Sequence, residues 1–318
     1  MKKILIVGAG GQIGSELVPY LRSIYGNENV IATDVRECKG LADEGPFEVL
    51  DALNPTNMAS AVARHSIDTI FNLVALLSAV GERNPQMAWG VNMTALMNSL
   101  EVARQHHCAV FTPSSIGAFG PTSPKDMTPQ DTIMQPTTIY GICKVTGELL
   151  SNYYHQKYGI DTRSIRFPGI ISNKTLPGGG TTDYAVEIFY EAIRKGRYTC
   201  NVPHDAYMDM IYMPDALRSI VELMEADPSK LKHRNSFNVA SMSFTPEILA
   251  AEIRKHMPSF EMDYDIDPVK EAIANSWPNQ LDDSCAREEW GWKPKWDISS
   301  MTKDMLSAIA KKLEAEKA

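Results

Sequence analysis

The chain has 318 residues, of which 44% are hydrophobic and 22% are charged, and these are ordinary values for a soluble globular protein. Its formal net charge of -8 argues against nucleic acid as the main partner, because binding to phosphates needs a basic surface. The length allows one large α/β domain or two smaller ones.

The N-terminus superficially resembles a signal peptide, because two lysines precede an apolar run. That run, Ile4–Val7, is short and ends in glycines, so it predicts a first β-strand instead. No stretch approaches the roughly 20 apolar residues of a membrane span. The five cysteines show no C-x-x-C spacing, which favours reduced thiols. We therefore expect a soluble cytoplasmic protein that is not attached to a membrane.

Short apolar runs alternate with helical patterns through the first half of the chain. Such alternation predicts a parallel, doubly wound sheet with helices on both faces. The expected strands are Lys3–Val7, Val30–Asp34, Phe47–Leu50, Thr69–Val74, Ala109–Pro113 and Thr162–Phe167. The expected helices are Gln12–Ile24, Thr56–His65, Pro85–His107 and Tyr140–Tyr158.

A glycine motif, Gly8-Ala-Gly-Gly11-Gln-Ile-Gly14, joins the first strand to the first helix. The first glycine permits a tight turn, the second lets backbone N–H groups approach a pyrophosphate, and the third lets the helix pack on the strand. The helix N-terminus adds unpaired donors and partial positive charge. The motif therefore predicts a dinucleotide site that includes Gln12 and Ile13, and a turn without a ligand is the alternative.

Acidic residues follow the next two strands. Asp34 ends the second strand, where a carboxylate can accept hydrogen bonds from both adenosine ribose hydroxyls. A 2′-phosphate there would meet like charge, so NAD is favoured over NADP, although Arg36 is close. Asp51 and Ala52 follow the third strand, where an acid can accept from the adenine amino group. The alternative for Asp51 is a helix N-cap.

The rhythm changes after Phe167. Asn173–Thr182 is rich in Gly, Pro and Thr and predicts a loop, whereas Asp183–Arg194 and Met301–Lys317 have helical patterns. We expect an α/β protein with a Rossmann-type, NAD-binding domain in residues 1–171, to which a segment at about 206–240 returns. Residues 172–318 mainly form a smaller C-terminal α/β lobe that binds the substrate over the cofactor cleft.

Tyr140 and Lys144 stand four residues apart at the start of a predicted helix and so share one helix face. A phenol has an ordinary pKa of about 10, and a nearby ammonium lowers the pKa of a phenol by stabilising the phenolate. Such a pair acts as a general base for an alcohol. Ser115, at the carboxyl end of a strand, is placed to hydrogen-bond the reacting oxygen. The alternatives are a solvated helix face for the pair and a turn or helix cap for the serine.

Taken together, these residues resemble the extended short-chain dehydrogenases/reductases, whose best-known members are nucleotide-sugar epimerases. The resemblance covers roughly residues 3–296. It is carried by the three glycines, Asp34, Asp51-Ala52, Asn72-Leu-Val-Ala75, Asn92, Ser115, Tyr140, Lys144, Arg166-Phe-Pro-Gly169, Tyr207–Ala216, Phe237–Ala240, Asp283–Ala286 and Gly291–Pro294.

The resemblance implies a role for each matched position. Tyr140 would be the acid/base, Lys144 would stabilise the phenolate and bind the nicotinamide ribose, and Ser115 would polarise the reacting oxygen. The cofactor site would also include Leu73, Ala75, Asn92 and Phe167. An amide that caps a helix or fills the core is the alternative for Asn92.

The block from Leu176 to Phe189 resembles the threonine-oxidising branch of this family, the short-chain L-threonine 3-dehydrogenases, as do Leu76–Glu82 and Asn275–Pro278. This implies oxidation of the C3 hydroxyl of L-threonine by NAD, giving L-2-amino-3-oxobutanoate. A glycine triplet before two threonines at a helix start also offers N–H and hydroxyl donors to a small carboxylate. The expected substrate residues are Ser78, Ser115, Tyr140, Gly180, Thr181, Thr182 and Trp277. The alternatives are a helix N-cap for either threonine and lobe packing for Trp277.

Two other functions remain open at this point. A nucleotide-sugar epimerase or dehydratase would share the cofactor half, but Lys174 is the only cation in residues 172–190, where a diphosphate would need several. An NAD-sensing regulatory protein would not need a tuned acid/base. No metal is expected, since the sequence has no cysteine cluster and no H-x-x-x-H. The resemblance also implies a homodimer in which the Pro85–His107 and Tyr140–Tyr158 helices form the interface. The alternative is that the apolar side chains of the first helix only face the sheet.

Overall fold

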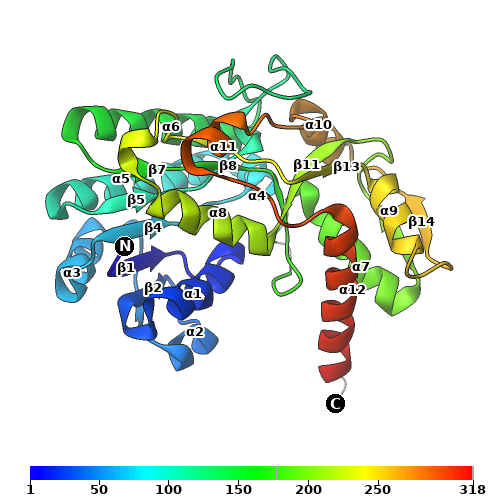
Figure 1. The fold of residues 1–318 in the computed structure, drawn as a ribbon, viewed down its shortest axis with the longest axis horizontal. Helices are drawn as coiled ribbons and strands as arrows, with labels where there is room; N and C mark the ends of the chain where they lie inside the picture. The colour runs from blue at the N-terminus through cyan, green and yellow to red at the C-terminus, as the bar shows by residue number, and fades with distance from the viewer. Residues whose placement is uncertain (177, 179, 317–318) are drawn as a thin grey trace.

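The central sheet of the computed structural model, which describes residues 1–176, 178 and 180–316, has six parallel strands (Figure 1). Their order, β3-β2-β1-β4-β5-β7, changes direction between β1 and β4, and ligands of open α/β sheets bind beyond the strand ends at such a point. The predicted Rossmann-type doubly wound sheet is confirmed. The strands are β1 (Ile4–Val7), β2 (Val30–Asp34), β3 (Phe47–Val49), β4 (Thr69–Asn72), β5 (Ala109–Phe111) and β7 (Thr162–Arg163).

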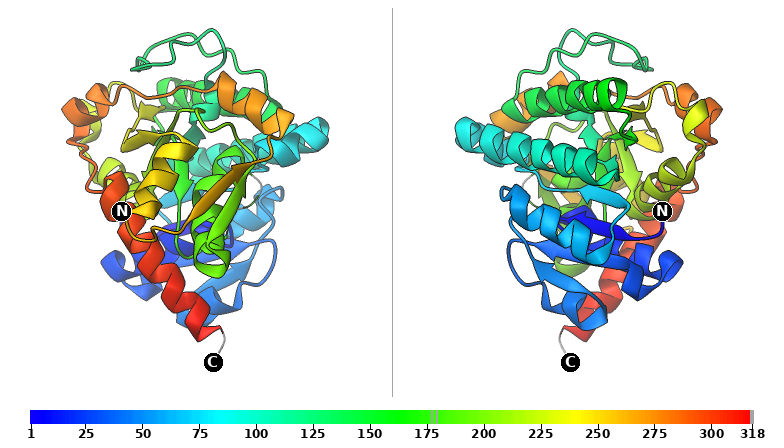
Figure 2. Two further views of the ribbon diagram at one scale, coloured as in Figure 1. Left: turned by 90° about the vertical axis from the view of Figure 1, so that its right-hand side faces the viewer. Right: turned by 90° about the vertical axis from the view of Figure 1, so that its left-hand side faces the viewer.

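Helices cover both faces of this sheet (Figure 2). One face packs against α3, α5 and α6 through buried apolar side chains such as Ala61, Leu96 and Cys143. The other face packs against α1 and α8 through Leu17 and Ile220. These helices are α1 (Gln12–Tyr25), α3 (Pro55–His65), α5 (Pro85–His106), α6 (Ile139–Tyr158) and α8 (Met213–Glu225), and the short α2 (Lys39–Glu44) and α4 (Ser78–Arg83) lie in the connections.

The predicted strand Thr69–Val74 ends two residues earlier, at Asn72. Two other predicted strands were too long because the chain passes from the central sheet into a second one. Pro113 has no N–H group for a sheet ladder, and β5 ends before it. The backbone N–H of Ser164 donates to Arg234 O (2.9 Å) and interrupts the predicted strand Thr162–Phe167. Beyond these breaks, β6 (Ser114–Ser115), β8 (Ile165–Phe167) and β12 (Phe237–Asn238) form a three-stranded parallel sheet.

The C-terminal lobe has its own apolar core, which includes Tyr184, Phe189, Phe244 and Met305. Segments after residue 206 also return to the first half, since Ile211, Ile220 and Phe237 share a core with α1. The exact division into domains stays a prediction. The remaining elements are β9 (Gly169–Ile171), α7 (Tyr184–Lys195), β10 (Arg197–Cys200), β11 (Met208–Tyr212), β13 (Met242–Phe244), α9 (Pro246–Arg254), β14 (Glu261–Tyr264), α10 (Pro268–Ser276), α11 (Ser284–Trp290) and α12 (Ile298–Ala315).

The described residues of the predicted loop Asn173–Thr182 have no regular structure before a short 3-10 turn at Thr181–Asp183, and α7 begins one residue later than predicted. Pro177 and Gly179 of that loop, and Lys317 of the predicted last helix, lie outside the described residues. Within the described part of the chain, no helix combines the length and apolarity needed to cross a membrane.

Candidate active site

The glycine motif forms the turn that the sequence analysis predicted. Gly8 has φ +87°, in the left-handed region that favours glycine. At Gly14 a Cβ atom would lie 2.6 Å from Gly8 O and 2.7 Å from Ala9 Cα, so only glycine lets α1 approach β1 this closely. The helix begins at Gly11 without a side-chain cap and without an acidic residue in its first turn. This end of α1 therefore suits an anionic group such as a pyrophosphate.

The acidic residues after β2 and β3 meet in one cleft. Asp34 Oδ2 accepts the backbone N–H of Gly10 (2.9 Å), which fixes the carboxylate beside the glycine turn. Asp51 does not cap α3, whose N-cap is Asn54, but accepts the N–H of Leu53 (2.9 Å) in a local turn. Both line a cleft of about 460 Å³, whose walls are Val7, Gly8, Gly11, Asp34, Val35, Leu50, Asp51, Ala52, Leu53, Leu73, Val74, Ala75, Met87 and Val91.

A second cavity continues this cleft toward the C-terminal lobe. Leu73 and Ala75, which follow β4, line both spaces. The second cavity, of about 150 Å³, is bounded by Gln12, Ile13, Leu73, Ala75, Leu77, Ser78, Pro113, Ser114, Ser115, Ile116, Tyr140, Lys144, Phe167, Pro168, Gly169, Ile170, Gly180, Thr181, Thr182, Asp183 and Trp277. The two cavities are thus neighbours at the carboxyl ends of the strands, where open α/β sheets bind their ligands, and we refer to them together as the groove.

Tyr140 and Lys144 both line the second cavity from the first turns of α6. The ammonium of Lys144 donates to Pro113 O (2.6 Å) and lies 5.2 Å from the centre of the Tyr140 ring. Ser115 lies opposite, at the end of β6, and its Oγ accepts the N–H of Gly117 (3.1 Å). Ser115 is thus a cap of the short turn after β6 and also a wall of the cavity. The three side chains of the predicted acid/base set are brought to one space.

Asn92 lies behind this set and does not line the main cavity. Its side-chain oxygen accepts the N–H of Leu76 (2.7 Å) and its nitrogen donates to Leu76 O (3.1 Å). The amide thus fixes the chain between β4 and Ser78. Asn92 and Lys144 share a small rear cavity of about 30 Å³, large enough for a water molecule.

The predicted substrate residues gather at the lobe side of the second cavity. Ser78, Thr181 and Trp277 are almost completely buried, and Gly180 and Thr182 are partly exposed. Neither threonine is the N-cap of α7, which is Asp183, so the simple capping alternative is wrong. Thr181 is only 1% exposed, and its buried hydroxyl has no hydrogen-bond partner. A buried polar atom of this kind needs an explanation, and a bound polar ligand is one.

The sequence analysis missed a buried ion pair beside the predicted acid/base set. Glu148 lies one helical turn after Lys144 and receives two N–H groups of Arg166, at 3.0 Å and 2.8 Å. Ser114 Oγ also donates to Glu148 (2.5 Å). All three side chains are buried, so the network rigidly joins α6 to β6 and β8. The sequence signal for this ion pair was the position of Glu148, four residues after Lys144 on the same helix face.

Several further wall residues were also missed. Leu77, Ile116, Ile170 and Asp183 line the second cavity beside the predicted ones. Asp183 Oδ2 accepts the N–H of Gly180 (2.6 Å) and shapes the end of the substrate loop. Pro168 and Gly169 were part of the motif that carried the family resemblance, and only their contact with the cavity was unexpected.

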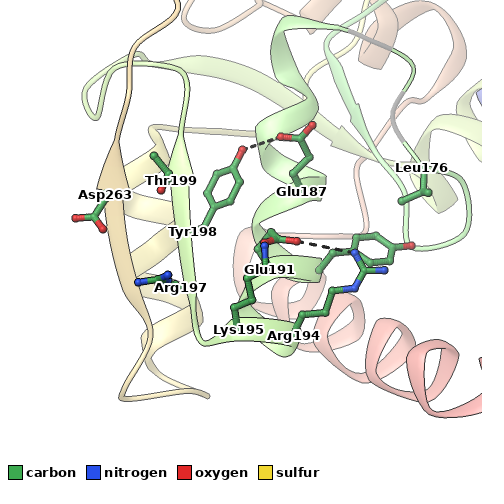
Figure 3. A pocket seen from close by; sticks show the side chains of 10 residues that line it. Leu176, Glu187, Glu191, Arg194, Lys195, Arg197, Tyr198, Thr199 and Asp263 are labelled. Carbon is green, nitrogen blue, oxygen red and sulfur yellow. Dashed lines mark hydrogen bonds and ion pairs between the residues drawn. The ribbon is translucent and has the colours of Figure 1, made fainter. Parts of the chain in front are cut away.

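A wider groove of about 710 Å³ lies on the outer side of α7 and β10 (Figure 3). Acidic and basic side chains are mixed along it: Lys195 and Arg194 both pair with Glu191, at 2.6 Å and 3.9 Å. None of the predicted site residues lines it. The smaller cavity, which collects the acid/base set, is therefore the candidate active site.

Comparison with known proteins identifies the family to which the chain belongs. The model of the NAD-dependent epimerase/dehydratase family matches residues 4–240, and the chain belongs to this family. It is 56% identical over 314 residues to an uncharacterized epimerase/dehydratase of Staphylococcus haemolyticus, covering 98% of this chain and 99% of that one.

Several solved structures that are similar to this chain are L-threonine dehydrogenases. An L-threonine dehydrogenase from Clostridium difficile has a TM-score of 0.96 and 54% identity, with 98% of each chain covered. A holo form of an L-threonine dehydrogenase from Cupriavidus necator has a TM-score of 0.94 and 51% identity, covering 96% of this chain and 99% of that one. The comparisons thus support an NAD-dependent oxidoreductase, as the sequence resemblance implied.

Proposed function

We propose that the protein is an L-threonine 3-dehydrogenase, which converts L-threonine and NAD+ to L-2-amino-3-oxobutanoate, NADH and a proton. The similarity to threonine dehydrogenases over nearly the whole chain supports this proposal. The observation that carries it is the hydroxyl of Thr181, which is buried without a partner at the cavity wall. A small polar substrate supplies the missing partner.

The residues from the glycine turn to Lys144 suit a dinucleotide cofactor. Asp34 would accept from the adenosine ribose hydroxyls, and the uncapped first turn of α1 would hold the pyrophosphate. Lys144 and Tyr140 would hold the nicotinamide ribose at the far end. When bound, NAD+ supplies the acceptor for the hydride that leaves C3.

The side chains around the cavity would transfer the proton and bind the substrate. Tyr140, as phenolate, takes the proton of the C3 hydroxyl on its Oη atom, and the Lys144 ammonium stabilises the phenolate. Ser115 donates a hydrogen bond to the same substrate oxygen. Ser78, Thr181, Thr182 and the Gly180 backbone hold the carboxylate and ammonium, and Trp277 closes the lobe side against water.

Nucleotide-sugar epimerisation or dehydration is the alternative, and it is favoured by the family description and the names of the curated relatives. Against it, Lys144 is the one cation among the described residues that line the cavity. A sugar nucleotide brings a second diphosphate, which usually needs cationic partners. The lining chemistry therefore favours a small zwitterion.

Thr181→Ala tests the proposed substrate site. Loss of a hydrogen bond to a charged group costs about 1.5–3 kcal/mol, so the KM for L-threonine should rise about 10- to 100-fold. With NAD+ present, L-threonine should raise the melting temperature of the wild type and raise that of the variant much less. The matched control is Thr199→Ala, on the exposed face of β10.

Two outcomes would contradict the proposal. An unchanged KM in Thr181→Ala would remove this hydroxyl from the substrate site. A melting temperature that rises with UDP-glucose and NAD+, but not with L-threonine, would favour the nucleotide-sugar alternative.

We also propose that two copies of the chain pair through α5 and α6, which pack side by side on one face of the molecule (Figure 2). Met93 and Leu96 are buried, as the sheet-facing alternative requires. However, a second set of large apolar side chains on these helices stays exposed: Met87, Trp89, Ile142, Leu149, Tyr153 and Tyr158. Exposed apolar side chains on two adjacent helices are typical of an interface, and Leu149 and Tyr153 share one face of α6.

A further inference from the structure

A cluster of metal-ligand side chains lies apart from the catalytic cavity. His233, Cys285 and Glu289 each offer one ligand atom, and these atoms all lie within 4.8 Å of one another. None of the three lines the catalytic cavity. The sequence analysis predicted no metal because no local ligand motif exists, and only the fold brings His233 to the other two.

The helix α11 explains the arrangement of two of these side chains. Cys285 and Glu289 are four residues apart on α11 and therefore share one face. His233 precedes β12, which packs against α11. The rings of Phe237 and Trp290 meet edge to face at 5.9 Å and hold the two elements together.

The carboxylate of Glu289 is oriented by the backbone. Its Oε2 atom accepts the N–H of Lys232 (2.5 Å) and the N–H of His233 (3.2 Å). Its Oε1 atom is hydrogen-bonded to Nδ1 of His233, and the side chain is only 9% exposed. A cation would take the place of the proton between these two atoms. The ligand oxygen is thus fixed before any cation arrives.

The imidazole is oriented from its other side. Nε2 of His233 lies 3.3 Å from Oδ2 of Asp131, whose side chain is 86% exposed. Without a cation, Nδ1 of His233 donates to the carboxylate of Glu289, which can only accept. When a cation displaces that proton, the neutral imidazole keeps its one proton on Nε2 for Asp131, and the lone pair on Nδ1 becomes a ligand. A carboxylate behind a histidine is the usual outer partner of a metal-bound imidazole.

We propose that this cluster binds one zinc-class divalent cation through His233 Nδ1, Cys285 Sγ and Glu289 Oε1, with water in the fourth position. Thiolate and imidazole donors suit Zn²⁺ and disfavour Mg²⁺ and Ca²⁺, which take oxygen ligands. Bound there, the cation joins α11, the segment before β12 and, through Asp131, the long connection to α6. Its effect is on stability, because no ligand reaches the catalytic cavity.

The test is titration of the purified full-length protein with Co²⁺ in the presence of a non-thiol reductant. The wild type should bind one equivalent and develop a thiolate-to-cobalt charge-transfer band. Cys285→Ser should lose the band and bind at least about 100-fold more weakly, since even outer partners contribute 10- to 100-fold. Asp131→Asn should keep the band and bind about 10-fold more weakly.

His65→Asn is the matched control. His65 Nε2 lies 2.5 Å from Glu48 Oε1, so it forms a histidine–carboxylate pair without a thiol, and its loss should leave the band and the affinity unchanged. Zn²⁺ should raise the melting temperature of the wild type more than that of Cys285→Ser, with dehydrogenase activity equal in both.

Three results would overturn the proposal. One is a wild type without the charge-transfer band. Another is a band of equal strength in Cys285→Ser, which would place the thiolate elsewhere. The third is an unchanged affinity in Asp131→Asn, which would contradict Nδ1 as the ligand and leave the imidazole as a bridge between two carboxylates.

Discussion

At the residue scale, the chemistry of a side chain depends more on its surroundings than on its spacing from other residues in the sequence. Helix α6 carries two Tyr-x-x-x-Lys pairs. In the second, Lys157 donates to Tyr153 Oη (2.5 Å), and this hydrogen bond lowers the pKa of Tyr153. Tyr153 is nevertheless 46% exposed and lines no cavity of the groove, whereas Tyr140 does. Position at the carboxyl end of the sheet is what makes the first pair a candidate acid/base.

Tyr140→Phe should reduce turnover by at least about 100-fold, because the variant has no hydroxyl to accept the substrate proton. The dissociation constant of NAD+ should change little, since most cofactor contacts lie elsewhere in the groove. Steady-state rates and calorimetric NAD+ binding check both statements. Tyr153→Phe, on the same helix, is the control, and a Tyr140→Phe enzyme with wild-type turnover would remove Tyr140 from the mechanism.

Asp34→Ala should weaken NAD+ about 10- to 100-fold, as expected when a charged acceptor is lost. NADP+ should be affected much less, because the repulsion between the carboxylate and a 2′-phosphate also disappears. The ratio of the two dissociation constants measures this. Glu37→Ala, an exposed acid in the same connection, should leave the ratio unchanged. If Asp34→Ala also leaves it unchanged, Asp34 does not read the ribose.

At the element scale, the beginning of the substrate loop is held between the cofactor helix and the C-terminal helix. The hydroxyl groups of Ser15, on α1, and Thr175 form a hydrogen bond (3.0 Å). Ser172 donates a hydrogen bond to Glu16, and burial raises the pKa of this carboxyl group. From the other side, Lys312 of α12 donates to Lys174 O (2.9 Å) and to Tyr190 Oη (3.1 Å). The beginning of the loop that ends at Thr181 is therefore linked to the N-terminal end of α1.

Lys312→Met should loosen this loop and raise the KM for L-threonine about 3- to 10-fold, in line with the loss of one or two partly exposed hydrogen bonds. The NAD+ affinity should not change, since Lys312 lies outside the cofactor groove. Lys311→Met, one residue earlier and exposed, is the control. Equal KM values in the two variants would show that α12 does not position the loop.

At the scale of the whole molecule, the sequence predicted what local patterns encode. Hydrophobic periodicity located the central strands, and the glycine motif, Asp34 and Tyr140 stood where a Rossmann-type sheet needs them. Local patterns did not identify the partners in contacts between distant segments. Tertiary packing determines the Arg166–Glu148 ion pair, the hydrogen bonds of Lys312 to the loop and the approach of His233 to Cys285. It also determines the strand break at Ser164.

The proposed pairing of α5 and α6 belongs to this scale. Leu149 is 62% exposed on α6, and Leu149→Glu should place a charge inside the dimer interface. Size exclusion with light scattering at about micromolar concentration should give a dimer for the wild type and a monomer for the variant. Ile248→Glu, on α9, is the control. A wild type that is a clean monomer would contradict the dimer.

The most direct test of the central claim is the formation of NADH by the purified protein from NAD+ and L-threonine at alkaline pH. D-threonine, L-serine and UDP-glucose are measured beside it under the same conditions. We predict that L-threonine is strongly preferred, because the cavity offers hydroxyl and N–H donors to a small zwitterion and a base to its C3 hydroxyl. No NADH from L-threonine, with epimerisation or dehydration of a sugar nucleotide instead, would contradict the account.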